Sequence, residues 1–280
     1  MTAKPILKWA GGKTQLLDEI NRRIPDHNDY YEPFFGGGAL LFYREPQNAH
    51  INDTNSELIN LYNVIKDYPN ELIELLSVHK ENNSSDYYYR IRSLDRSPAY
   101  KTMTNIEKAA RMFYLNKTCF NGLYRVNAQG FFNVPYANYN NPTIYIEEEV
   151  LALSRYLNGN VTITNLDFAQ AVDDTHENDF VYFDPPYFPV SDTGYFTSYS
   201  KEGFTDYDQQ RLKDCCDMLT ARHVKWMVSN SDCDEVRELY NDYHIDILNA
   251  KRSINCKGSR RAECREIVIR NYEIPEIDEE

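Results

Sequence analysis

The segment FVYFDPPYFPV, residues 180–190, sets a carboxylate and an aromatic ring directly after an apolar run. The apolar residues predict a buried strand, and two prolines stop it. Asp184 can accept hydrogen bonds at the end of that strand, and Pro185 offers a carbonyl without a competing N–H donor. Tyr187 supplies a flat ring face. The stretch therefore predicts a binding site at the mouth of a strand, where hydrogen-bond acceptors and an aromatic surface meet.

A second candidate site lies in YYEPFFGGGALLF, residues 30–42, which predicts a strand, a glycine-rich turn and a helix. Glycines let a ligand approach the backbone closely, and a helix N-terminus favours negative or polar groups. Asp53 ends the next expected strand, 21 residues after Glu32, where nucleotide-binding α/β folds hold ribose hydroxyls. A glycine turn alone is equally compatible with tight packing. Together with the spaced acid, it predicts a cofactor that contains a nucleoside.

The stretch LKWAGGKT, residues 7–14, suggests a phosphate-binding P-loop as an alternative. The P-loop pattern requires a glycine at the position of Leu7, and it follows a strand instead of preceding the first one. The P-loop interpretation therefore fails on both counts.

The elements that must position these residues alternate along the chain. Strands are expected at residues 29–34, 49–53, 161–166, 179–186, 225–231, 243–248 and 265–272. Helices are expected at 16–24, 37–45, 56–68, 70–80, 105–117 and 205–219, the last with Thr205 and Asp208 at capping-box spacing. This order predicts an α/β fold with a mostly parallel sheet that helices cover on both faces.

Residues 55–159 interrupt the alternation with helices and then a loop-rich aromatic stretch, TCFNGLYRVNAQGFFNVPYANYNNP (118–142). We therefore predict two domains. One consists of residues 1–54 and 160–280, and the other, residues 55–159, is inserted into it.

Composition excludes several classes of protein. No segment of the 280 residues approaches the roughly 20 apolar residues of a membrane span, and the N-terminus does not resemble a signal peptide. The six cysteines form no Cys-x-x-Cys pair, so reduced thiols are expected and a zinc site is not. A cytoplasmic protein without a metal site is therefore expected.

The net charge of −13 hides two basic clusters, residues 86–125 and 251–270. Such clusters on an acidic protein can bind the phosphates of a nucleic acid. Charge alone leaves open the alternative that they are solvated helix faces.

Four motifs occur together in the order LKWAGGK, EPFFGGGALLF, NGLYRVN with GFFNVPY, and DPPYFP. In this combination the chain resembles the bacterial and phage DNA adenine-N6 methyltransferases of the Dam type. The resemblance covers nearly the whole chain and is weakest in residues 70–105 and the acidic tail. It implies a Rossmann-like methyltransferase fold with residues 55–159 as target-recognition domain, and S-adenosyl-L-methionine as cofactor.

The resemblance implies a catalytic role for Asp184 and the Pro185 carbonyl, the hydrogen-bond acceptors after the strand. The exocyclic amino group of adenine is a poor nucleophile, because its lone pair is delocalised into the ring. Asp184, ionised at neutral pH, and the Pro185 carbonyl would accept hydrogen bonds from its two N–H groups as the nitrogen becomes tetrahedral. Tyr187 would stack on the base, which must be flipped out of the duplex to reach the pocket.

By resemblance, LKWAGGK and the glycine turn enclose the cofactor. Asp53 would hold its ribose, and Asp167 with Phe168 would contact its adenine. The expected cofactor residues are Trp9, Gly11, Gly12, Lys13, Glu32, Phe34, Gly36, Asp53, Asp167, Phe168 and Asp184.

The same resemblance places the turn NGLYR in the major groove of double-stranded DNA. Arg125 would form a bidentate contact to guanine O6 and N7. Leu123 and Pro135 would make apolar contacts, for example to thymine methyl groups.

The other expected DNA contacts surround this turn. Asn121 and Tyr139 would support the duplex around the flipped base, Ser191 would contact a phosphate, and Lys8 would reach DNA at the rim of the cofactor pocket. Asn138 stands where the family often has a basic residue, which argues against a phosphate contact there.

The sequence thus predicts an enzyme, associated with DNA in the cytoplasm, that methylates adenine N6 within GATC. A cytosine-N4 or RNA amino-methyltransferase is an alternative, but its tetrapeptide usually starts with Ser or Asn, so Asp184 counts against it. A non-catalytic DNA-binding subunit of a restriction-modification system is another, although such a subunit would be expected to lose these motifs. A cognate restriction endonuclease is a possible partner.

Overall fold

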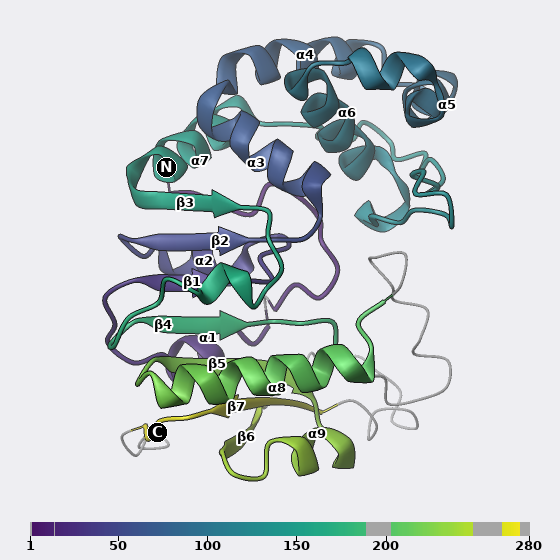
Figure 1. Cartoon of the computed structure of the whole chain (residues 1–280). Helices are drawn as coiled ribbons and strands as arrows, with labels where there is room; N and C mark the ends of the chain where they lie inside the picture. Colours follow the sequence, from purple (N-terminus) through teal and green to yellow (C-terminus); the bar gives the residue numbers. More distant parts are fainter. Residues whose placement is uncertain (1, 14, 189–202, 249–264, 275–280) are drawn as a thin grey trace.

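The computed structural model describes residues 2–13, 15–188, 203–248 and 265–274. Its centre is a seven-stranded sheet in the order β3-β2-β1-β4-β5-β7-β6 (Figure 1). Adjacent strands from β3 to β5 are parallel, whereas β7 runs antiparallel to both β5 and β6. The strands are β1 (Tyr30–Glu32), β2 (Ala49–Asn52), β3 (Val161–Thr164), β4 (Phe180–Phe183), β5 (Lys225–Ser231), β6 (His244–Leu248) and β7 (Glu266–Arg270).

All seven strands fall within runs expected from the sequence, and the mostly parallel α/β sheet is confirmed. Six expected helices are also present, and α8 begins with the expected capping box between Thr205 and Asp208. The helices are α1 (Leu17–Asn21), α2 (Ala39–Arg44), α3 (Ser56–Asp67), α4 (Pro69–Glu81), α5 (Ser85–Ser93), α6 (Asn105–Thr118), α7 (Glu147–Asn160), α8 (Asp206–Ala221) and α9 (Asp234–Leu239).

Three helices, α5, α7 and α9, were not expected. Ile146, the residue before α7, gives no side-chain cap, although Glu147, Glu148 and Glu149 in the first turn favour the start of a helix. Val150, Leu153 and Leu157 are buried at helical spacing, and this spacing could have revealed the helix. None of the helices in the described ranges is long and apolar enough to span a membrane.

The central strands β1, β4 and β5 are buried on both faces, because their successive residues point to opposite sides and helices cover each side. In β4, Phe180 and Tyr182 join one core with residues of α1, α2, α3, α6 and α7. Val181 and Phe183 join a second core with residues of α8 and α9. The strand before the Asp-Pro-Pro-Tyr turn is thus fixed from both sides.

The first core continues from the sheet into α3, α6 and α7, so part of residues 55–159 packs directly on the sheet. A third core joins α5 and α6 to the aromatic stretch, through Cys119, Phe132 and Val134, and to Ile144 just after it. Figure 1 shows this stretch, which follows α6, on the side to which the parallel strands point. The division into two domains at residues 54 and 160 stays a prediction.

The basic cluster at residues 86–125 is in part a buried structural feature. Arg111 is only 1% exposed, lies 2.8 Å from Asp95, and donates to the carbonyls of Ile91 and Arg92. Arg96 pairs with the same carboxylate. The expectation that the whole cluster binds phosphates is therefore wrong for Arg111, because these partners already occupy its guanidinium group. Most of the second cluster, residues 251–264, lies outside the described residues.

Candidate active site

Three acidic residues follow neighbouring strands at the carboxyl edge of the sheet. Glu32 ends β1, Asp53 comes directly after β2, and Asp184 comes directly after β4. Because β1 lies between β2 and β4 as a parallel neighbour of both, the three residues share one edge. The strand order reverses at this position, which is where open α/β sheets bind ligands. The topology therefore places the two candidate sites of the sequence next to each other.

Asp184 forms an ion pair with a lysine from LKWAGGK. Lys13 Nζ lies 2.9 Å from Asp184 Oδ1, donates to the Gly11 carbonyl at 3.2 Å, and stands 4.3 Å from the ring centre of Tyr187. The Tyr187 hydroxyl donates to Glu266 Oε2 at 2.9 Å, and Lys13 Nζ lies 4.0 Å from the same oxygen. Burial raises the pKa of Asp184, whereas Lys13 opposes this rise. The site holds a cation between two carboxylates and above an aromatic face.

Glu32 is almost completely buried beside this group. The Tyr30 hydroxyl donates to Glu32 Oε2 at 2.9 Å. Burial raises the pKa of Glu32 to about 8, and the nearby Asp184 carboxylate adds to the rise. The hydrogen bond from Tyr30 lowers this pKa and so opposes the rise. A protonated carboxyl group can donate as well as accept a hydrogen bond.

The glycine turn after β1 is closed by Asp53 and covered by Trp9. Gly36 N–H donates to Asp53 Oδ2 at 2.9 Å, and Asn55 N–H donates to Oδ1 at 2.8 Å. Burial raises the pKa of Asp53, and these two bonds oppose the rise. A Cβ atom at Gly36 would lie 2.8 Å from the Trp9 ring, and one at Gly37 would lie 2.9 Å from its Cβ. Glycine is needed here because the tryptophan lies directly against the turn.

Aromatic rings gather beside the turn after β3. Phe34 and Phe168 stack with ring centres 5.2 Å apart. Asp167 lies 2.7 Å from Arg211 of α8, whose guanidinium group stands 4.9 Å from the Phe168 ring centre. The structure thus brings together residues that are more than 130 positions apart in the chain. Of the other expected cofactor residues, Gly11 and Gly12 are exposed.

Several of the residues expected to contact DNA lie around the turn after α6. Asn121 N–H donates to the Tyr139 hydroxyl at 3.1 Å, and Lys8 Nζ stands 4.8 Å from the Tyr139 ring centre. Arg125 is exposed, and its Nε donates to Asn133 Oδ1 at 2.7 Å. Leu123 is half-buried.

Two more residues were expected to contact DNA, Pro135 and Ser191. Pro135 is exposed, and its carbonyl accepts a bond from Phe120 N–H at 2.9 Å. Ser191 lies outside the described residues.

A buried asparagine connects the turn NGLYR to the cofactor side. Asn116 of α6 is 3% exposed and accepts from Lys8 N–H at 2.9 Å. Its Nδ2 donates to the Lys8 carbonyl at 2.7 Å and to the Gly122 carbonyl at 3.0 Å. The next residue, Trp9, stacks on Tyr124 with ring centres 5.4 Å apart. The segment Lys8–Trp9 therefore lies between the glycine turn and the turn NGLYR.

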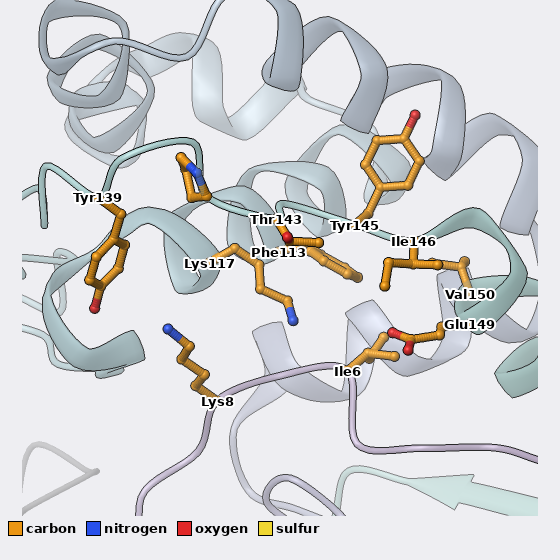
Figure 2. Close-up of a pocket in the computed structure, with 11 residues that line it drawn as sticks. Ile6, Lys8, Phe113, Lys117, Tyr139, Thr143, Tyr145, Ile146, Glu149 and Val150 are labelled. Atoms are coloured by element: carbon orange, nitrogen blue, oxygen red, sulfur yellow. The ribbon is translucent and has the colours of Figure 1, made fainter.

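A cavity of about 370 Å³ lies beside Lys8 and Tyr139. Figure 2 shows the side chains of Lys8 and Lys117 extending into it from two different segments. Burial lowers the pKa of Lys117, and the Lys8 ammonium adds to this effect, whereas Glu149 opposes it. Neither lysine forms an ion pair within the part of the chain that the structure describes. The cavity is therefore lined by two ammonium groups and by one carboxylate, that of Glu149.

Three residues near the Asp-Pro-Pro-Tyr turn were not predicted from the sequence. Glu266 begins β7, Gln209 lies near the start of α8, and Asn230 lies near the end of β5. Asn230 could have been found, because β5 is a parallel neighbour of β4 and polar residues at such strand ends face the same edge. Glu266 had no comparable signal, because it reaches the site through the antiparallel β7.

The chain is similar to known proteins over most of its length. Residues 9–254 match the model of the D12 class N6 adenine-specific DNA methyltransferases. The chain is 48% identical to the type II methyltransferase M1.LlaDCHI of Lactococcus lactis subsp. cremoris over 271 residues, 96% of this chain and 95% of that protein. It is 41% identical to the type II methyltransferase M.MjaIII of Methanocaldococcus jannaschii, over 97% of this chain and 100% of the relative.

A further relative is the DNA adenine methylase of Escherichia coli strain K12, 32% identical over 95% of this chain and 94% of that protein. The family model and these relatives extend over nearly the whole chain, including both candidate sites. The chain therefore belongs to the D12 class of N6 adenine-specific DNA methyltransferases.

Proposed function

We propose that the protein transfers a methyl group from S-adenosyl-L-methionine to N6 of an adenine that is flipped out of double-stranded DNA, within GATC. The choice of adenine is that of the family. The cofactor, the flipped base and the recognition sequence are our inference. The recognition sequence rests on the resemblance of the turn NGLYR to that of the Dam-type enzymes.

The observation that supports this proposal best is the position of the Lys13 ammonium. It donates to Asp184 at 2.9 Å while it stands 4.3 Å from the ring centre of Tyr187. An amino group attached to a base on Tyr187 would need the same arrangement of acceptor and ring. Lys13 therefore occupies a position suited to an N–H donor. The target amino group would take this position when Lys13 moves aside.

The residues at the carboxyl edge suit a cofactor with an adenosine and an amino acid part. Asp53 and the turn at Gly36 would face ribose hydroxyls, because both carboxylate oxygens retain acceptor capacity beyond their main-chain bonds. Phe34 and Phe168 present rings to an adenine, and Glu32 offers an acceptor for an amino group. When bound, the cofactor supplies an electrophilic methyl group.

The chain's own residues would then act on the target nitrogen. Asp184 and the Pro185 carbonyl accept hydrogen bonds from its two N–H groups, which directs its lone pair toward the methyl group and stabilises the developing positive charge. The nitrogen forms its bond to the methyl carbon as the S–C bond breaks, with a thioether as the leaving group, and it then loses one proton. Tyr187 holds the ring by stacking, and closure by Trp9 keeps water away from the charged groups.

Residues 55–159 would form the target-recognition domain. Asn133 holds Nε of Arg125, and in the described part of the chain neither terminal nitrogen of Arg125 has a hydrogen bond. Those two nitrogens would meet guanine O6 and N7. The cavity with Lys8 and Lys117 would accept a phosphate of the duplex, because its two ammonium groups outnumber the one carboxylate in its lining, that of Glu149.

One experiment tests this function. The chain is incubated with labelled S-adenosyl-L-methionine and a duplex that contains one GATC site, and the digested nucleosides are identified by mass spectrometry. We expect N6-methyladenine in this duplex, and little in duplexes with one base of the site changed. Label in N4-methylcytosine or only in RNA would support the alternative enzymes, and absence of transfer with intact DNA binding would support a non-catalytic subunit.

Two relatives are named type II methyltransferases. We therefore also infer that the protein protects DNA from a restriction endonuclease with the same recognition sequence. Methylated duplex should resist such an endonuclease, whereas duplex treated with an inactive variant should be cut.

A further inference from the structure

The turn after β4 is held by two buried amide side chains from other elements. Gln209 of α8 and Asn230 of β5 are 2% and 0% exposed. Gln209 Nε2 donates to the Pro186 carbonyl at 3.2 Å, and Phe188 N–H donates to Asn230 Oδ1 at 3.0 Å. Asn230 Nδ2 donates to Gln209 Oε1 at 3.3 Å. These bonds close a ring around Tyr187, which lies between the two main-chain groups. We call Gln209 and Asn230 the amide clamp.

The chemistry of the clamp requires amides at both positions. Gln209 must donate to a carbonyl and accept from an amide at the same time, and Asn230 must do the same. An ionised carboxylate at either position could only accept, and it would add negative charge near Asp184 and Glu266. Buried polar groups are costly unless they are fully bonded, and these bonds connect β4, β5 and α8 in one network.

We propose that the amide clamp consists of positioning residues for methyl transfer, which set the plane of the Tyr187 ring. The clamp fixes the main chain on both sides of Tyr187, and Glu266 fixes its hydroxyl at 2.9 Å. With these three points held, the target base stacks in one orientation and presents its amino group to Asp184. This inference rests on the proposed function, in which Tyr187 carries the base.

Gln209→Met removes the donor and the acceptor at nearly constant length. The rate of methyl transfer under single-turnover conditions should fall by about tenfold to a hundredfold, because a small misplacement of a reacting group is costly. Affinities for cofactor and DNA should change by less than about twofold, since the clamp is not proposed to hold either one. The control is Gln210→Met at the next residue, whose exposed side chain donates to Asp214, and its rate should equal that of wild type.

A double-mutant cycle separates positioning from general damage. In a Tyr187→Ala background, Gln209→Met should have almost no additional effect on the rate, because the ring that the clamp orients is absent. If the two effects multiply, Gln209 does not act through Tyr187 and the proposal is overturned.

A readout independent of activity keeps this inference distinct from the proposed function. The Phe188 amide should exchange slowly with solvent in wild type and in Gln210→Met, and faster in Gln209→Met and Gln209→Glu. Equal exchange in all four proteins would overturn the clamp. If Gln209→Met does not fold, as judged by circular dichroism, Gln209→Glu provides the rate and exchange comparison, because it keeps the acceptor for Asn230. Equal exchange of the Phe188 amide would overturn the clamp and leave the proposed function untouched. Failure of wild type to methylate adenine would overturn the proposed function instead.

Discussion

At the scale of single residues, the site combines one cation with several carboxyl groups. Lys13 offsets Asp184, while burial raises the pKa of Glu32, Asp53 and Asp184. Such an arrangement is typical of functional sites, because a fold gains nothing from burying acids without enough positive charge. Ligand amino groups and hydroxyls would supply the missing donors.

Asp184→Asn tests the acceptor at the reacting nitrogen. The amide has the same shape, but it lacks the charge and would turn a donor or a weaker acceptor toward the amino group. We expect methyl transfer to fall by about a hundredfold to a thousandfold, the cost of removing one preorganised partner of a transition state. Cognate DNA should still bind. A turnover number within about tenfold of wild type would contradict the role of Asp184.

Arg125 and Lys117 should differ in what they recognise. Arg125→Ala should allow methylation of sites changed at one base pair, because one bidentate contact discriminates by about 1–3 kcal/mol. Lys117→Ala should weaken binding to all sequences alike and reduce the slope of log affinity against log salt by about one. Methylation of single-mismatch duplexes and binding at several salt concentrations would measure both effects. If Arg125→Ala remains as selective as wild type, this arginine contacts phosphate instead.

At the scale of elements, the positions of the strands could be predicted from the sequence better than the strands and helices that pack beside them. The apolar runs before Glu32, Asp53 and Asp184 are local signals. They made it possible to find the ends of these strands, and with them the Asp-Pro-Pro-Tyr turn and the glycine turn. The contacts made by Glu266 and by the amide clamp depend on which strands and helices become neighbours. The strand β7 was expected, but its antiparallel pairing with β5, which brings Glu266 to the site, had no local signal. The start of α7 lacks a side-chain cap, so only the spacing of Val150, Leu153 and Leu157 could have revealed that helix.

The turn NGLYR depends on the fit between Gly122 and the N-terminal segment. Gly122 has φ +65°, and a Cβ atom there would lie 2.3 Å from Lys8 Cβ. Gly122→Ala should therefore lower stability by more than the roughly 1–2 kcal/mol of a left-handed alanine, and weaken DNA binding because Lys8 and the turn separate. Gly130→Ala is the matched control, because Gly130 has φ +84° and no atom within 4 Å of the added Cβ.

Thermal unfolding and DNA titrations of both variants would measure this difference. Gly130→Ala reports the strain of the backbone alone. Equal losses in the two variants would show that the contact with Lys8 adds nothing to stability or to DNA binding.

At the scale of the whole molecule, the net charge of −13 coexists with DNA binding because the charges are separated. Lys8, Lys117 and Arg125 lie on the surface around the turn after α6, whereas Glu32 and Asp184 are withdrawn into the edge of the sheet. The buried carboxyl groups affect the stability of the entire fold, because their ionisation is coupled to unfolding.

Glu32→Gln makes this coupling measurable. Glu32 has a pKa of about 8 in the folded protein, against 4.5 for an ordinary glutamate. Between these values the unfolded chain is ionised while the folded protein keeps its proton, so each pH unit lowers the free energy of unfolding by about 1.4 kcal/mol. This destabilisation is absent below pH 4.5, grows as the pH rises, and is complete above pH 8. Glutamine does not titrate.

The unfolding free energy of the Glu32→Gln variant, minus that of wild type, should therefore grow from about pH 5 to about pH 8 and stay constant above it. Urea denaturation without cofactor across this range would measure the difference. The control is Glu81→Gln, which makes the same chemical change at an exposed position. Parallel curves for Glu32→Gln and wild type would show that Glu32 ionises alike in the folded and unfolded chains, and its burial would then carry no electrostatic cost.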